Sequence, residues 1–431
     1  MKPEGRFLLL RFLTASTYDP IRLNMEMLSR QHGVSKHACE TVCSRLKAFD
    51  DTYRRGSRWV GLRGYYESLM SKVENENIDF SLVENKSLID KLLTCDLKKC
   101  GYLGKPLDGK LQISNILLLV ILLHYSDALG CVRGIGYSLL LRLMGGISED
   151  RFKSQIETLK ATGYLLNATG GATGRYLFGK STGVMHLNLM KIQNPLFSFS
   201  DGKDVDISQI ELVNLLFPSL AMMSIVSAVC GSAGPAHYKA ISLRLPMSSS
   251  PDFLASTKNI DHLLFDSIRV NRVDVLLQLK LEELISTLIS KIGLGEKNVD
   301  QLVSDICKAD GIFTAKYKHE CEQKGSGVLE AELNLFQKTL AQLVIGVTCT
   351  LIKILNTDFS VRINGEHTIV YPHEMAHSTK SSIQSKFYIV SKQNDDSLVI
   401  TSIEYSYLQA YKQSKYPNRV NGWELKVERF T

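Results

Sequence analysis

The chain has 431 residues, of which 44% are hydrophobic and 22% are charged, and its formal net charge is +7. A chain of this length has room for two or three domains, and this composition argues against wholesale disorder. The mild positive charge permits an anionic partner but does not identify one. The nine cysteines are scattered without a CxxC pair, which argues against a disulfide framework and favours a reducing compartment.

The apolar runs of the sequence are too short for membrane spans. Residues 116–123 and 220–229 form the two most apolar runs, whereas a bilayer needs about 20 residues. The apolar stretch at the N-terminus is interrupted by Arg11 and is not followed by a convincing signal-peptide cleavage pattern. We therefore expect a cytoplasmic protein with no membrane partner and treat both runs as core helices.

Residues 1–65 are predicted to form a first DNA-binding domain. Residues 6–15 predict one helix, and Leu28 lies on the apolar side of the next. Gly33 permits a left-handed turn, and Ser35 can cap a further helix. The pattern of Leu28, Gly33, Val34 and Ser35 resembles the helix-turn-helix of bacterial regulators, which implies that the helix after Ser35 reads DNA.

This resemblance implies a set of DNA contacts in the first domain. The basic segment at residues 53–59 follows the helix and has a Gly-Ser tip, as expected of a wing that touches phosphates. A solvated surface turn is the alternative. The expected contacts are Lys36, His37, Thr41 and Arg45 on the helix, and Arg54, Arg55 and Arg58 on the wing.

Residues 66–110 are predicted to be a linker with one short helix at 88–95. The glycines and the proline within 101–109 indicate a boundary. Residues 111–195 are predicted to form a second domain, with a buried helix at 113–125, a helix at 137–144, a turn at Gly145-Gly146 and a helix at 148–162.

The helix at 148–162 and the segment after it carry the second resemblance. Ser148 can cap this helix, Phe152, Ile156 and Leu159 share its apolar face, and Gly163 can end it. A strand at 164–166, a glycine-rich tip at 167–174 and a return at 175–178 would follow. Together they resemble the recognition helix and wing of a winged helix-turn-helix domain. A second turn at 180–183, before a strand at 184–189, is also compatible with the sequence.

The second domain therefore has its own predicted contacts. Arginine pairs with guanine and glutamine with adenine in the major groove. The alternative is a helix packed inside a larger α-helical fold. The expected contacts are Arg151, Lys153, Gln155 and Lys160 on the helix, and Arg175 on the wing.

The second half of the chain is predicted to form a helical domain at 196–358 and a β-rich part at 359–431. Residues 281–292 form an amphipathic helix, and residues 329–354 carry a coiled-coil-like seam. The seam predicts either a homodimer or packing on the chain's own helices. Strands are expected at 360–363, 368–371, 387–390 and 398–403, with a hairpin turn at 393–396 and an edge strand at 423–430.

One motif points to an enzyme. His373, Glu374 and His377 form an HExxH pattern, which on a helix can bind zinc and activate water, as in the metallopeptidases that it resembles. Pro372 stands directly before the motif and polar residues follow it. This context favours a surface turn, so we expect no catalytic residue, no bound metal and no cofactor.

The predicted fold class is mixed and mainly α, with two winged helix-turn-helix domains followed by a helical region and a small β-rich part. The first half resembles tandem winged-helix proteins, namely bacterial regulators and plasmid replication initiators. This resemblance implies sequence-specific binding of double-stranded DNA, with transcription regulation as the function and no enzymatic activity. The alternatives are a replication initiator or other mobile-element DNA-processing factor, and a zinc metallopeptidase with a DNA-binding module.

Overall fold

The computed structural model describes residues 1–14, 25–52, 83–105, 109–173, 180–195, 203–204, 273–293, 319, 348, 352, 366–370, 382–392, 398–408 and 423–430. About 55% of this part is helical, and small antiparallel sheets account for its strands. The expectation of a mixed, mainly α protein is thereby confirmed. No helix among the described residues is both long enough and apolar enough to cross a membrane.

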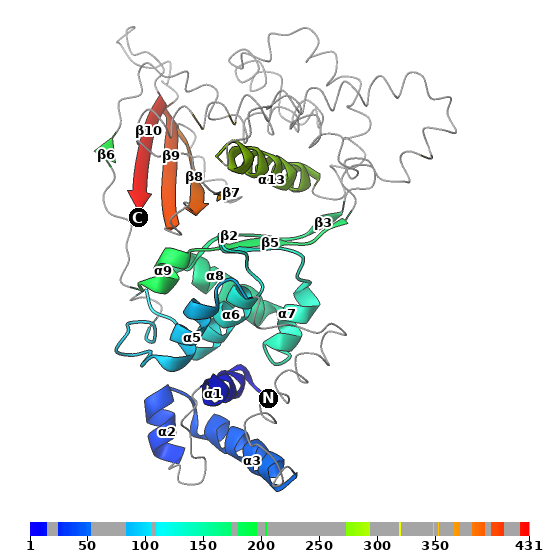
Figure 1. Ribbon diagram of the computed structural model, residues 1–431, viewed down its shortest axis with the longest axis vertical. Helices are drawn as coiled ribbons and strands as arrows, with labels where there is room; N and C mark the ends of the chain where they lie inside the picture. The colour runs from blue at the N-terminus through cyan, green and yellow to red at the C-terminus, as the bar shows by residue number, and fades with distance from the viewer. Residues whose placement is uncertain are drawn as a thin grey trace. The chain divides into compact units, whose positions relative to one another are not determined.

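The chain forms two compact units (Figure 1). Unit 1 comprises Met1–Thr169 and Gly183–Ser198, and unit 2 comprises Gly170–Thr182 and Phe199–Thr431. Both predicted helix-turn-helix segments therefore fall in unit 1. The predicted dimerisation helix at 329–354 lies outside the described residues, apart from Thr348 and Ile352, which are helical.

The centre of unit 1 is the apolar helix α6. The helices of its first part are α1 (Pro3–Thr14), α2 (Met25–His32), α3 (Lys36–Thr52), α5 (Lys86–Thr94) and α6 (Ile113–His124). Every residue of α6 from Ile113 to Leu123 is buried, as the run of apolar residues predicts. Helix α1 contacts α3, α5 and α6, so the first helices share a core with the later ones.

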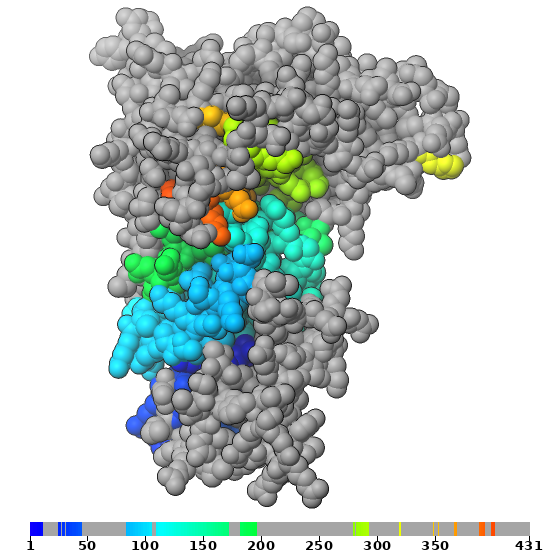
Figure 2. Space-filling model, in the orientation of Figure 1, coloured from blue at the N-terminus to red at the C-terminus, as the bar shows by residue number. Residues whose placement is uncertain are grey.

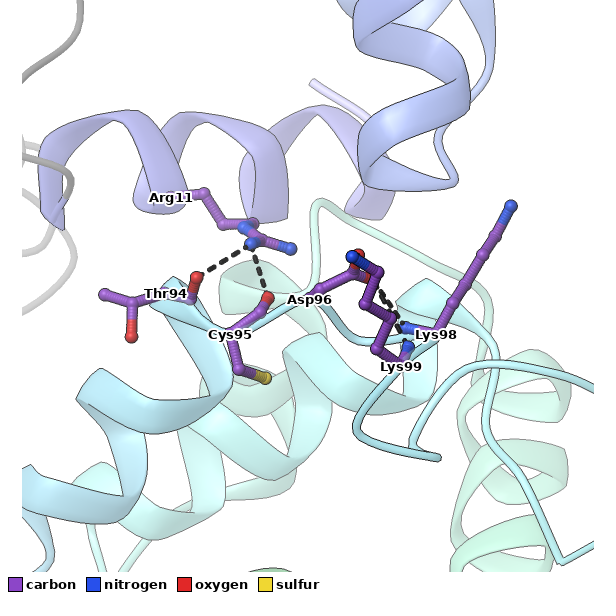
Figure 3. Close-up of polar contacts among 6 residues, drawn as sticks. All are labelled: Arg11, Thr94, Cys95, Asp96, Lys98 and Lys99. Atoms are coloured by element: carbon purple, nitrogen blue, oxygen red, sulfur yellow. Dashed lines mark hydrogen bonds and ion pairs between the residues drawn. The ribbon is translucent and has the colours of Figure 1, made fainter.

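Two arginines of α1 bind carbonyl groups at the ends of neighbouring helices. Arg6 Nη1 donates to the Leu143 carbonyl at 2.9 Å. Arg11 Nη2 donates to the Cys95 carbonyl at 2.7 Å and to the Thr94 carbonyl at 3.4 Å (Figure 3). The last carbonyls of a helix have no partner within that helix. The two guanidinium groups therefore provide donors for them and attach α1 to the rest of the unit.

The second part of unit 1 combines helices with a three-stranded sheet. Its elements are β1 (Cys131–Val132), α7 (Tyr137–Leu143), α8 (Glu149–Ala161), β2 (Leu165–Thr169), β5 (Val184–Leu187) and α9 (Leu189–Gln193). The sheet has the antiparallel order β1-β5-β2. The buried helix, the helix pair around Gly145-Gly146 and the strand after it thus lie where the sequence predicts them.

The turn between α7 and α8 requires a glycine at Gly145. Gly145 has φ +94° and Gly146 has φ +72°, a region that side chains with a Cβ rarely enter. A Cβ at Gly145 would also lie 2.5 Å from the Met1 carbonyl oxygen. The turn is therefore fixed both by its backbone conformation and by the close approach of another segment.

The hairpin after α8 differs from the first prediction. Strand β2 continues through Thr169, and β5 is its partner among the described residues. Beyond them, β3 (Ala172–Thr173) pairs with β4 (Lys180–Ser181), and residues 174–179 lie outside the described part. The predicted tip at 167–174 is wrong because Asn167 and Thr169 are buried, and Asn167 Nδ2 donates to Thr169 Oγ1 at 3.0 Å. Their polarity is satisfied inside the protein and does not mark a loop.

Unit 2 contains a five-stranded antiparallel sheet with the order β6-β10-β9-β8-β7. Its strands are β6 (Lys203–Asp204), β7 (Glu366–Val370), β8 (Ser382–Lys392), β9 (Leu398–Leu408) and β10 (Trp423–Phe430). The predicted hairpin of β8 and β9 is confirmed, since Lys392 pairs with Leu398. The expected edge strand β10 lies inside the sheet, because β6 pairs with it from far away in the sequence. The predicted strand at 360–363 lies outside the described residues.

Helix α13 (Val273–Gly293) packs against the strand β7. It includes the predicted amphipathic helix at 281–292, and Ile285, Leu288 and Ile289 are buried. Ser290 Oγ joins the two elements, since it accepts from the His367 N–H at 2.8 Å and donates to the His367 carbonyl at 3.0 Å. The periodicity of the sequence therefore predicted both the helix and its buried face.

Candidate nucleic-acid interface

Helix α8 begins, ends and buries one face as the sequence predicts. The Ser148 side chain accepts a hydrogen bond from the Arg151 N–H at 3.4 Å at the start of the helix. Phe152, Ile156 and Leu159 are buried. Gly163, just after the helix, has φ +77°. These contacts fix α8 in unit 1 and determine which side chains remain at the surface.

The outward face of α8 is solvent-exposed along most of its length. Lys160 is partly buried, and its Nζ lies 3.3 Å from Glu157 Oε1. Arg151 and Lys153 are therefore the exposed cations of this face. The exposed polar and charged residues of the helix are Glu149, Asp150, Arg151, Lys153, Ser154 and Glu157.

Gln155 does not belong to this outward face. Its side chain is 5% exposed, so the expectation that it lies outside the core is wrong. Along α8, residues 152, 155, 156 and 159 occupy one face at spacings of three and four, and Gln155 lies in the middle of the apolar stripe. The position of Gln155 on the helix, not its polarity, decides its burial. In this conformation the Gln155 amide cannot reach a base.

Tyr137 is a surface residue beside α8 that the sequence did not single out. It is 38% exposed at the start of α7. Its hydroxyl donates to the Glu149 carbonyl at 3.2 Å, and its ring meets Phe152 edge to face with centroids 4.9 Å apart. Tyr137 thus orients the first turn of α8. The one local feature of the sequence that marks its position is Gly136, the N-cap of α7 directly before it.

The pair α2 and α3 has the turn that the sequence predicts. Gly33 has φ +65°, and Ser35 Oγ accepts a hydrogen bond from the Ala38 N–H at 3.3 Å. The expected apolar positions Leu28, Ala38 and Val42 are buried. The two helices, the turn between them and the apolar positions thus lie where the sequence predicts them.

The N-terminus of α3 already holds a carboxylate from α1. Glu4 Oε2 accepts from the Ser35 N–H at 3.1 Å and from Ser35 Oγ at 2.7 Å. A helix N-terminus favours negative charge, and here Glu4 supplies it. A phosphate group would have to displace this side chain, so the cations of the first turn are better placed for DNA contacts than the backbone amides.

The predicted contacts of the first domain are only partly described. Lys36 and His37 are exposed on α3. Thr41 is partly buried, and its hydroxyl donates to the His37 carbonyl at 2.8 Å. The side chain of Arg45 and the residues Arg54, Arg55 and Arg58 lie outside the described part, as does Arg175 of the second domain.

The exposed charges of α8 nearly balance. Glu149, Asp150 and Glu157 are acidic, whereas Arg151 and Lys153 are basic. Such a face does not attract a polyanion strongly by charge alone, because nonspecific DNA binding depends on an excess of Lys and Arg. The face can instead offer hydrogen-bonding groups at defined positions, which is what the recognition of base edges requires.

The described residues contain no metal site. No group of three or more His, Cys, Asp or Glu side chains suited to a metal ion occurs among them. The HExxH residues His373, Glu374 and His377 lie outside the described residues, so the zinc alternative stays a sequence-based hypothesis.

The candidate interface thus consists of the outward face of α8, with the exposed first turn of α3 as a second element of unit 1. No family model matches the chain, and neither a curated protein nor a solved structure matches it.

Proposed function

We propose that unit 1 binds double-stranded DNA sequence-specifically and that the protein regulates transcription. The observation that carries the proposal is the arrangement of α8, which buries Phe152 and Ile156 while Arg151, Lys153 and Ser154 stay exposed. A helix that presents such side chains fits the major groove, where arginine and lysine bind guanine and serine can bind either base.

The elements next to α8 in the sequence support the proposal that this part of unit 1 is a winged helix-turn-helix. Helix α7, the Gly145-Gly146 turn and α8 form a helix pair, and the hairpin of β2 and β5 follows directly and joins β1 in one sheet. This hairpin is the proposed wing. The sequence between β3 and β4 contains Arg175, which we assign to phosphate contacts on the basis of the sequence alone.

Helices α2 and α3 are the proposed second reading element. The turn at Gly33 and the exposed Lys36 and His37 favour a second DNA segment for this pair. One chain would then cover two neighbouring segments of duplex. The steep salt dependence of phosphate contacts would accompany this mode of binding.

The decisive experiment combines selection of duplexes from a random pool with fluorescence anisotropy of the selected sequence. We expect the double variant Arg151→Ala/Lys153→Ala to bind at least about tenfold more weakly, since each base or phosphate contact contributes about 1–3 kcal/mol. Its preference at a few base pairs should relax. The slope of log affinity against log salt should fall by about 1 for each phosphate contact that is lost.

The matched control is Lys98→Ala/Lys99→Ala, which removes two exposed lysines from the turn after α5. This variant removes the same number of positive charges as the α8 variant but leaves α3 and α8 intact, so we expect the affinity and the selected sequence to stay unchanged. Equal losses in the two variants, or none in the α8 variant, would refute the assignment. Selection of directly repeated sites would favour replication initiation over transcription regulation.

A further inference from the structure

Helix α1 connects the two helix pairs of unit 1, α2 with α3 and α7 with α8. It packs against α3 and against α6, which in turn packs against α8 (Figure 1). Phe7, Leu8 and Leu9 follow one another on α1, so their side chains leave the helix in directions about 100° apart, and all three are buried. Little of the dark-blue α1 is visible on the face drawn in Figure 2. Neighbouring elements thus cover α1 on several sides, and it acts as an internal spacer.

Glu4 attaches the start of α1 to the first helix pair. Its Oε2 accepts hydrogen bonds from the Ser35 N–H at 3.1 Å and from Ser35 Oγ at 2.7 Å. Ser35 directly precedes α3. Hydrogen bonds to a charged group are stronger than those between neutral groups. The contact therefore fixes the beginning of α3, with its exposed Lys36 and His37, relative to α1.

Arg6 attaches the same part of α1 to the second helix pair. Its Nη1 donates to the carbonyl of Leu143, the last residue of α7, at 2.9 Å. Its Nε donates to the Met1 carbonyl at 3.3 Å. The Met1 oxygen approaches the turn before α8 so closely that a Cβ at Gly145 would lie 2.5 Å from it. Arg6 and the first residue of the chain therefore fix the turn that leads into α8.

One short helix thus holds both proposed reading elements. Domains of one chain usually move relative to each other unless their interface is large and apolar. Between α3 and α8 the connection runs through the packed helices α1 and α6 and through the charged hydrogen bonds of Glu4 and Arg6. This connection resists a change in the separation or the rotation of α3 relative to α8.

We propose that the ligand of unit 1 is a bipartite duplex whose two half-sites stand at one fixed spacing, and that Glu4 and Arg6 are the positioning residues that set this spacing. Helix α3 contacts one half-site and α8 contacts the other. The fixed spacing rests on the proposed DNA binding and specifies the kind of site that is bound.

The first test is a spacing series with the native full-length chain. The duplex selected from a random pool supplies the half-sites, and base pairs are then inserted between them. An insertion of 5 base pairs moves one half-site to the opposite side of the duplex, and one of 10 returns it to the same side about 34 Å further along. A rigid unit can follow neither change. In fluorescence anisotropy we expect the affinity to fall at least about 100-fold, to that of a duplex with a single half-site.

The second test is the double variant Glu4→Ala/Arg6→Met. Its readout is the affinity for the selected spacing divided by the affinity for a spacing one base pair longer, which moves the half-site by about 3.4 Å and a tenth of a turn. We expect this ratio to fall at least about tenfold, since the helix pairs can then shift. The affinity for each single half-site should not fall. Partial unfolding would lower every affinity alike and leave the ratio unchanged.

The matched control is Glu26→Ala/Arg30→Met, which removes an exposed ion pair of the same two residue types on α2. It should keep the native ratio. An equal fall in the control, or a native ratio in the Glu4→Ala/Arg6→Met protein, overturns the role of Glu4 and Arg6.

The possible failures can be told apart. Failure to enrich any duplex refutes the DNA binding itself, and the fixed spacing with it. Enrichment of a single half-site, or full affinity at the spacing that is 10 base pairs longer, overturns the fixed spacing and leaves the DNA binding standing.

Discussion

Gln155 shows how a single buried amide weakens the helix that carries the proposed interface. Its side-chain nitrogen and oxygen are both buried and have no hydrogen-bond partner among the described residues, while its backbone carbonyl accepts from Asn115 Nδ2 at 3.4 Å. A buried polar group without a partner costs about 1–3 kcal/mol. The amide is therefore a local destabilising feature between α8 and α6.

Replacement of this amide should stabilise the protein. Gln155→Met keeps the length of the side chain and removes the two polar atoms, so we expect the free energy of unfolding to rise by about 1–2 kcal/mol. Chemical denaturation followed by circular dichroism measures the change. DNA affinity should not fall, since Gln155 does not lie on the outward face of α8.

The control for this change is Gln112→Met, at an exposed residue that precedes α6 and makes no side-chain cap. We expect it to change stability by less than about 0.5 kcal/mol. A destabilised Gln155→Met protein would show that the amide has a partner in solution. Lower DNA affinity of that variant would restore Gln155 to the set of contact residues.

At the scale of elements, α1 depends on the contact of Arg11 with the end of α5. Arg11 is 8% exposed, and it binds the Thr94 and Cys95 carbonyls (Figure 3). Hydrogen bonds to a charged group contribute about 1.5–3 kcal/mol. The contact thus joins the first helices to the core around α6.

Arg11→Met should reduce the free energy of unfolding of unit 1 by about 1.5–3 kcal/mol, since the apolar stem is retained and the two acceptors lose their donor. Hydrogen exchange of peptides from α1 and α5 measures the effect in this unit. Arg30→Met is the matched control. The ion pair of Arg30 with Glu26 has side chains that are 80% and 69% exposed, and such surface pairs contribute about 1 kcal/mol at most. Similar losses in both variants would contradict the role of Arg11.

The sequence predicted elements that have a strong local signal. Ser148, the 152–156–159 spacing and Gly163 define α8 without any tertiary information, and the glycines at 33 and 145 mark turns. Strand β1 has only two residues, Cys131–Val132, which is too few for an alternating pattern. Strand β6 pairs with β10 across more than two hundred residues of sequence, and no local pattern can predict such a pairing.

For the candidate interface, the same distinction between local and tertiary information applies. The exposure of Lys36, His37, Arg151 and Lys153 follows from helical periodicity and was predicted. The burial of Gln155 follows from its position on the helix, which a rule based on residue polarity overlooks. The carboxylate of Glu4 at Ser35 depends on how α1 packs against α3, and the sequence alone does not provide that.

At the scale of the whole molecule, each unit contains a buried histidine that resists protonation. In unit 1, burial, followed by the positive charge of Arg11, lowers the pKa of His32 to about 4, although Asp96 acts in the opposite direction. In unit 2, burial lowers the pKa of His367 to about 4, and its Nδ1 lies 2.7 Å from Ser391 Oγ. Both units are thus expected to be sensitive to acid.

The sign of this dependence follows from proton linkage. An unfolded histidine has a pKa of about 6.5, so between pH 6.5 and pH 4 it binds a proton that the folded histidine does not bind. The free energy of unfolding is therefore highest above pH 6.5 and declines as the pH falls toward 4. We expect a loss of about 2–3 kcal/mol for each unit over this range. Hydrogen exchange at several pH values, corrected for intrinsic rates, reports the two units separately.

Histidine variants assign the loss to each unit. His32→Gln should flatten the pH dependence in peptides from α2 and α3, and His367→Gln should do so in peptides from β7 and β8. His37→Gln, at an exposed position of α3, should leave both profiles unchanged. Unaltered profiles in His32→Gln and His367→Gln would mean that other groups cause the acid sensitivity.

The path of the chain has a practical consequence for work with fragments. The backbone passes from one unit to the other at residues 169/170, 182/183 and 198/199. Strand β3 lies in the segment Gly170–Thr182, which belongs to unit 2, and it contacts α13. A fragment that ends near residue 198 would contain β3 and β4 but lack α13, the helix that β3 contacts. A clone that starts there would lose a piece of unit 2. Unit 1 can be studied alone if a short designed turn replaces residues 170–182, whereas unit 2 needs these residues to remain complete.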